Sequence, residues 1–248
     1  MKSRILWMLA LVVLGQLWMA GPASAALLLS DDFNGTTLDT AKWATPTMPY
    51  GNVITVADSK VTLTTAYIVS KDTFAPSATV ADATTVTASF KIGPYFTSEW
   101  VTFGFLNATG LNIGPTGSGP GIYLTNELWG STWYFVGLQV RNDAGAYTYS
   151  YTGYPPTDRW VMGTDSTATI AWSKTSFKVF IEGTPVFTFA PTNPADIPST
   201  PLSATFGDWW ATASLDSVSV NTVPEPSAVA LLTTGLCGWL CAARRKRA

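Results

Sequence analysis

The sequence predicts an all-β protein, a sandwich of two antiparallel sheets, and three observations lead to this fold class. First, between residues 27 and 222 no run with the 3.6-residue period of an amphipathic helix exceeds two turns. Second, short runs such as Asn52–Val56 and Thr84–Ile92 alternate between two faces, which is typical of half-buried strands. Third, these runs are rich in Thr, Val, Phe, Tyr and Trp and are separated by polar turns. About twelve short strands of this kind favour two packed sheets.

The remaining strands are expected at similar intervals along the middle of the chain. Residues 177 to 189 are expected to form a β-hairpin, because two alternating runs flank Glu182-Gly183-Thr184 and Gly183 accepts the backbone conformation of a tight turn. The other predicted strands are Trp100–Phe105, Thr132–Val140, Ala168–Trp172 and Ser214–Val220.

Length and terminal patterns divide the 248 residues into three segments. We expect a secretory signal peptide at residues 1–25, one β-sandwich domain at 26–222 and a C-terminal sorting segment at 223–248. The middle segment is long enough to bury one sizeable core. Its only Gly/Pro/Ser-rich tract, Asn112–Gly121, is short and is expected to be a surface loop.

Charge and composition exclude several functions. Six of the fourteen basic residues lie in the two end segments, which leaves eight basic against fifteen acidic residues in the middle. An acidic domain repels phosphate backbones, so no nucleic-acid partner is expected. The chain has no histidine, the commonest metal ligand and general base. Its two cysteines, Cys237 and Cys241, lie in the C-terminal apolar run, so we expect no disulfide in the domain and no cofactor.

The N-terminus has the three parts of a secretory signal. Lys2 and Arg4 precede an uncharged, mostly apolar run from Ile5 to Gly15, and small residues at Ala23 and Ala25 predict cleavage after Ala25. An uncleaved N-terminal anchor is the alternative.

The C-terminus is also tripartite. The motif Pro224-Glu225-Pro226 precedes an uncharged segment from Ala228 to Ala243, and the basic tail Arg244, Arg245, Lys246 and Arg247 follows. Sixteen helical residues span about 24 Å, slightly less than a hydrocarbon core of about 30 Å, and snorkelling arginines extend that span. The basic tail is expected to stay in the cytoplasm, which places the domain outside the inner membrane.

This C-terminal order resembles the PEP-CTERM sorting signal of Gram-negative bacteria that produce exopolysaccharide. The resemblance covers about the last 26 residues and implies recognition by a membrane exosortase, which cleaves near the motif. The transmembrane segment would then hold the protein in the inner membrane only transiently. The resemblance therefore implies export to the cell envelope, the outer surface or the extracellular matrix. A plain C-terminal membrane anchor is the alternative.

Three segments of the middle domain resemble the concanavalin A-like jelly roll, as in laminin-G-like domains and laminarinase-type glycoside hydrolases. They are the opening Asp31–Trp43, the strand and hairpin Ala168–Phe189, and the closing Phe206–Val218. The resemblance implies a jelly-roll sandwich. The hydrolases of this superfamily carry Glu-x-Asp-x-x-Glu on one strand. This sequence lacks that motif: the nearest match begins at Glu127, with Trp129 and Thr132 at the other two positions. Glu127 is expected to be a solvated strand-edge residue, and no catalytic residue is predicted.

Tryptophans are the candidate glycan contacts, because the C–H side of a sugar ring stacks on an aromatic face. The candidates are Trp209, Trp210, Trp129 and Trp133, with core packing as the alternative for each. A calcium site at Asp31, Asp32 and Asp216 would have too few ligands, so no metal is expected.

The sequence thus predicts an exported, non-catalytic protein that binds glycans, or forms part of the matrix, in an exopolysaccharide or biofilm. The expected partners are the exosortase, through the sorting segment, and an extracellular polysaccharide. Two alternatives stay open: a glycoside hydrolase or polysaccharide lyase with a divergent site, and a purely structural surface protein.

Overall fold

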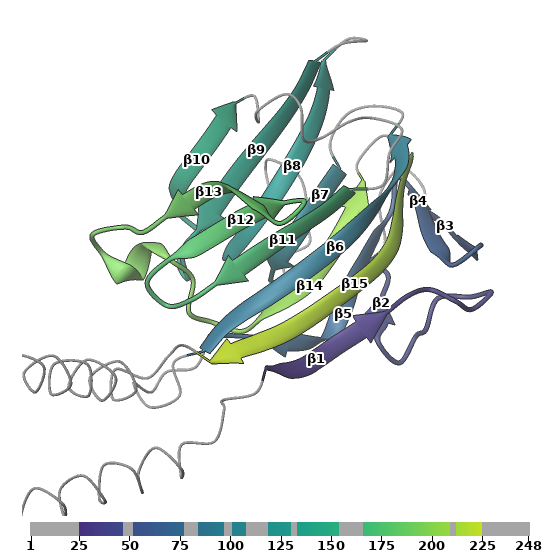
Figure 1. Cartoon of the computed structure of the whole chain (residues 1–248), viewed down its shortest axis with the longest axis horizontal. Coiled ribbons are helices and arrows are strands. Elements are labelled where there is room, and N and C mark those ends of the chain that lie inside the picture. The colour runs from purple at the N-terminus through teal and green to yellow at the C-terminus, as the bar shows by residue number, and fades with distance from the viewer. Residues whose placement is uncertain are drawn as a thin grey trace, which may run out of the picture.

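The chain folds into two antiparallel β-sheets packed face to face, shown in Figure 1 as a computed structural model. The structure describes residues 25–46, 52–76, 84–96, 101–107, 119–129, 133–153, 166–208 and 212–224. Within these ranges the regular structure consists of fifteen strands and one short 3-10 helix, η3 (Pro194–Asp196). The predicted all-β jelly-roll sandwich is confirmed.

The first sheet has eight strands in the order β13-β12-β11-β6-β15-β4-β3, with β1 also paired to β15. The central strands β6 and β15 are its longest and run antiparallel from Thr84↔Pro224 to Phe96↔Ala213. The bounds are β1 (Ala26–Asp31), β3 (Val53–Ala57), β4 (Lys60–Thr64), β6 (Thr84–Phe96), β11 (Ser166–Trp172), β12 (Phe177–Ile181), β13 (Thr184–Phe189) and β15 (Thr212–Pro224).

The second sheet has seven strands in the order β10-β9-β8-β7-β14-β5-β2. Strands β7, β8, β9 and β10 follow one another in sequence and lie side by side, so this part of the sheet is a meander (Figure 1). The bounds are β2 (Trp43–Ala44), β5 (Tyr67–Phe74), β7 (Val101–Leu106), β8 (Gly121–Trp129), β9 (Trp133–Arg141), β10 (Tyr147–Gly153) and β14 (Leu202–Asp208).

The core lies between the two sheets and is supplied by alternate strand positions. In β11 the positions from Ser166 to Trp172 alternate strictly between buried and half-buried, as expected for a strand with one face on the core. In β7, by contrast, all positions from Val101 to Phe105 are buried, so other parts of the protein pack against both faces of this strand. The largest fully buried side chains come from both sheets: Trp43, Trp172, Tyr67, Phe90, Phe103, Phe105, Phe177 and Phe206.

The strand predictions agree with the structure to within a few residues. The hairpin of β12 and β13 is confirmed, and its turn shows why Gly183 stands there. Glu182 and Gly183 both have positive φ angles, 48° and 72°, which is the pattern of a type I′ turn. From the sequence, we predicted the special turn conformation for Gly183 but not for Glu182.

The predicted signal peptide lies outside the described residues except for Ala25, and the predicted sorting segment lies outside them beyond Pro224. In the described part of the chain, no helix is long and apolar enough to cross a membrane.

Candidate functional site

The outer face of the seven-stranded sheet, the face turned away from the core, carries a polar cluster on β8, β9 and β10. On β8 and β9 the inner positions are the fully buried apolar residues Ile122, Leu124, Leu138 and Val140. The alternate positions belong to the outer face. There Tyr123 lies opposite Gln139, and Arg141 lies opposite both Gly121 and Tyr147.

The side chains of this outer cluster contact one another. The Tyr123 hydroxyl donates a hydrogen bond to Gln139 Oε1, and Arg141 Nη2 donates one to the Tyr147 hydroxyl. The Arg141 guanidinium carbon lies 4.0 Å from the ring centre of Tyr147 and 6.0 Å from that of Tyr123. Arg141 is 2% and Tyr123 4% exposed, whereas Tyr147 is 50% exposed. The cluster therefore consists of two buried side chains, Arg141 and Tyr123, and of the half-exposed ring of Tyr147.

Electrostatics keep the Tyr123 phenol protonated. Burial raises the pKa of Tyr123 well above its ordinary value, and the charge of Arg141 lowers that pKa by less than burial raises it. Neighbouring Tyr147 raises the pKa further. Tyr123 can thus donate a hydrogen bond at any physiological pH but cannot serve as a base.

A β-bulge decides which tyrosines of β10 belong to this cluster. In a regular strand Tyr147 and Tyr149 would share one face, because they are two residues apart. The pairing of β10 with β9 shifts between them, so Tyr147 lies opposite Arg141 and Tyr149 opposite Val140. Tyr149 consequently packs inward, with its ring 4.5 Å from that of Phe189. The bulge thus leaves Tyr147 on the outer face.

Three residues singled out from the sequence lie at the other end of the β8–β9 pair. The register places Glu127 opposite Phe135 and Trp129 opposite Trp133, next to the turn that joins the two strands. Glu127 and Trp129 hold alternate positions of β8 in the same series as Tyr123. The other two candidates, Trp209 and Trp210, lie outside the described residues.

The structure places this outer cluster, apart from Tyr147 on β10, and three of the residues singled out from the sequence on the same pair of strands, but at opposite ends of it. Tyr123, Gln139, Arg141 and Tyr147 were not predicted as site residues. One signal was available: Arg141 is a basic residue directly following the apolar run that ends at Val140, in a domain with only eight basic residues.

A pocket lies where the β9–β10 turn, the β11–β12 turn and η3 meet. Its volume is about 480 Å³, and Asp143, Lys174, Pro194 and Ile197 are among the residues that line it. The Asp143 carboxylate accepts four hydrogen bonds, two from backbone N–H groups and two from the hydroxyls of Ser199 and Thr200. Burial raises the pKa of Asp143, but these four bonds together outweigh burial and leave its pKa below the ordinary value. The carboxylate thus fastens the segment after η3 and has little capacity left for a ligand.

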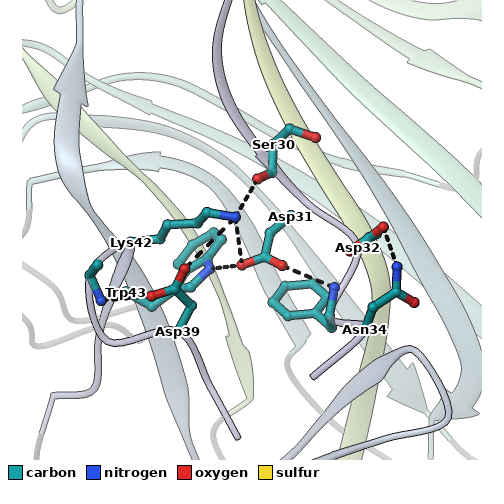
Figure 2. A network of polar contacts seen from close by, with 9 residues as sticks. Ser30, Asp31, Asp32, Asn34, Asp39, Lys42 and Trp43 are labelled. Carbon is teal, nitrogen blue, oxygen red and sulfur yellow. Dashed lines mark hydrogen bonds and ion pairs between the residues drawn. The ribbon is translucent and has the colours of Figure 1, made fainter. Parts of the chain in front are cut away.

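The opening segment of the domain contains a network around Asp31, shown in Figure 2. Asp31 accepts hydrogen bonds from the backbone N–H of Phe33 at 3.0 Å and from Trp43 Nε1 at 2.8 Å. Lys42 Nζ lies 3.7 Å from the same carboxylate and donates to the Ser30 carbonyl at 2.9 Å. These contacts fasten the loop between β1 and β2 to the sandwich.

Two of the three carboxylates considered for a calcium site are paired with lysines, and the third, Asp32, accepts a hydrogen bond from the Asn34 side chain. Asp31 is paired with Lys42, and Asp216 lies 3.2 Å from Lys60. Among the described residues, no group of three or more acidic, histidine or cysteine side chains is arranged to hold a metal ion.

Several solved structures of glucan-cleaving enzymes share this fold. The endo-1,3-β-glucanase from Streptomyces sioyaensis matches with a TM-score of 0.60 at 12% identity, over 83% of this chain and 99% of that one. The endo-β-1,3-glucanase from Pyrococcus furiosus matches with a TM-score of 0.56 at 15% identity, over 81% and 96%. The laminarinase from Flavobacterium sp. UMI-01 matches with a TM-score of 0.55 at 17% identity, over 79% and 99%. At these identities the likeness establishes the concanavalin A-like jelly-roll fold. No family model and no curated protein matches the sequence.

These neighbours correct one conclusion drawn from the sequence. The sequence predicted a non-catalytic protein, and this is contradicted by the match to almost the whole length of several endo-glucanases. The prediction rested on the missing Glu-x-Asp-x-x-Glu motif. A missing motif excludes one arrangement of carboxylates on one strand, but it does not exclude a site assembled from several strands.

Proposed function

We propose that this protein is a glycoside hydrolase that cleaves a β-linked glucan, with a site on the outer face of the seven-stranded sheet that diverges from the laminarinase motif. One observation carries the proposal. The shared fold spans between 96% and 99% of endo-β-glucanases such as the three described above, so the chain corresponds to their whole domain.

Two features of the outer face support this location. Buried Tyr123 and Arg141 and half-buried Gln139 form a polar group there, and such side chains can orient sugar hydroxyls. Glu127 is also in the series of β8 positions that contains Tyr123. Hydrolysis needs a proton donor at the leaving glycosidic oxygen, and we assign this role to Glu127. Because β8 carries no second acidic residue, the base that activates water has to come from another element.

The test is a reducing-end assay on β-1,3- and mixed-linkage β-glucans with the purified protein and its Glu127→Gln variant. We expect the wild type to release reducing ends and Glu127→Gln to lose about 100-fold or more in kcat, the usual contribution of a general acid. Glu182→Gln is the matched control, because Glu182 lies in the β12–β13 turn of the other sheet. It should keep the wild-type rate.

Three results would contradict this proposal. If the wild type turns over none of these glucans, the hydrolase proposal fails. If it does turn them over but Glu127→Gln is equally active, Glu127 is not the acid. Products with an unsaturated, ultraviolet-absorbing end would identify elimination and overturn hydrolysis.

We also propose that the protein is exported and sorted by an exosortase through Pro224-Glu225-Pro226 and the basic tail Arg244–Arg247. The tripartite C-terminus and the N-terminal signal pattern support this route. We expect a full-length chain in the membrane of a host without exosortase and a chain shortened near the motif in a competent host. Mass spectrometry of the C-terminus distinguishes them. An intact basic tail on protein from the competent host would argue against this sorting route.

A further inference from the structure

Tyr147 presents one accessible aromatic face whose reverse side is held in place. The residue begins the edge strand β10, and half of its surface is exposed. The Arg141 guanidinium lies 4.0 Å from its ring centre and donates a hydrogen bond to its hydroxyl. Arg141 is almost fully buried and also lies 6.0 Å from the ring centre of Tyr123. The ring orientation is therefore fixed before any ligand arrives.

We propose that Tyr147 is a stacking platform for one sugar ring of the glucan, at a distal part of the binding site. This inference rests on the proposed glycan hydrolase function and adds a substrate-binding residue to it. The C–H side of a β-linked pyranose is apolar and matches the exposed ring face. A ring that is already held by a cation beneath it loses little conformational entropy when the sugar binds.

The strand register gives the distance between this platform and the proposed acid. Tyr147 is level with Arg141 and Gly121, and Glu127 is six residues further along β8. At the rise of a β-strand, these six residues span roughly 20 Å, and β10 lies two strands, or about 10 Å, from β8. A short oligosaccharide bound at Glu127 therefore cannot reach Tyr147, whereas a long chain lying across the sheet can.

This separation makes the proposal testable through chain length. We expect Tyr147→Ala to raise KM for a long soluble β-1,3-glucan about fivefold, which corresponds to about 1 kcal/mol for a stacking contact, and to leave kcat unchanged. The same variant should cleave a β-1,3-linked trisaccharide as the wild type does. Tyr147→Phe keeps the ring and should retain a KM near that of the wild type. Val53→Ala, which removes an exposed apolar side chain on β3 of the other sheet, is the control.

Affinity electrophoresis in gels that contain the polymer gives a second measurement that does not depend on turnover. Tyr147→Ala should migrate faster than the wild type in such gels and equally in gels without polymer. Thermal melts establish that each variant is folded, and Tyr147→Leu, which keeps apolar bulk over Arg141, replaces the alanine variant if that one unfolds.

The outcomes separate the two proposals. If the folded Tyr147→Ala protein, or Tyr147→Leu in its place, shows the wild-type KM and mobility with the polymer, the platform is overturned while the hydrolase proposal stands. If the wild type is retarded by the polymer without cleaving it, and Tyr147→Ala loses the retardation, the hydrolase proposal fails and the platform stands. A wild type that neither cleaves nor binds the polymer overturns both.

Discussion

Replacing Trp172 by alanine should lower the free energy of unfolding by about 3–5 kcal/mol, the usual cost of emptying a large aromatic site in a core. Trp172 is fully buried at the end of β11 in the eight-stranded sheet, and its ring lies 5.3 Å from that of Phe105 in the opposite sheet. It therefore joins the two layers. Its Nε1 also donates a hydrogen bond of 3.1 Å to the Pro198 carbonyl, which would lose this partner.

Urea unfolding followed by far-ultraviolet circular dichroism measures this loss without depending on tryptophan fluorescence. Trp172→Phe should cost less, because it retains an aromatic ring beside Phe105 and loses mainly the bond to Pro198. The exposed Val53→Ala variant should stay within about 0.5 kcal/mol of the wild type. A Trp172→Ala protein as stable as the Val53→Ala protein would contradict the packing described here.

Replacing Asp31 by alanine is expected to cost about 2–4 kcal/mol, since it leaves two donors without an acceptor at a buried position. Trp43 Nε1 and the Phe33 N–H both point to this carboxylate, and both residues are at most 3% exposed. Asp31→Asn should also be destabilising, because an amide offers one oxygen and turns its NH₂ group toward the other donor.

Asp32→Ala is the matched control for this network. Asp32 is exposed and accepts a hydrogen bond from the side chain of its neighbour Asn34 (Figure 2). Its removal should change the free energy of unfolding by less than about 0.5 kcal/mol. Equal urea midpoints for the Asp31→Ala and Asp32→Ala proteins would show that the Asp31 bonds do not stabilise the fold.

The sequence predicted the strands because alternation and strand propensity are local properties. The hairpin at Glu182-Gly183 is the clearest example, since both strands and the turn lie within 13 consecutive residues. The same alternation predicted the strand Ala168–Trp172, which the structure has as β11. What alternation cannot give is a shift in register. The bulge that sends Tyr147 outward and Tyr149 inward follows from how β10 pairs with β9, and the sequence Tyr-Thr-Tyr predicts one face for both.

The candidate site was harder to predict for the same reason. Trp129 and Trp133 were selected because a single residue type, tryptophan, suggests sugar stacking on its own, whereas Glu127 was expected to be a solvated strand-edge residue. Arg141 becomes informative only when strand pairing brings Gly121, Tyr147 and Tyr123 beside it, and alternation within a single strand does not give that register. The prediction of a non-catalytic protein was wrong because it depended on one missing motif, the only catalytic pattern with which the sequence could be compared.

The pairing of β1 with β15 determines how the domain would be presented on a surface. Ala26 lies opposite Thr222, so the first and last described strands begin and end side by side at one end of the eight-stranded sheet. Figure 1 shows the end of β8 and the start of β9 at the other end of the molecule. A membrane that holds either terminal segment would therefore hold the domain by this one end. The end of the seven-stranded sheet where β8 ends and β9 begins would then point away from the lipid, toward polymers in the surrounding medium.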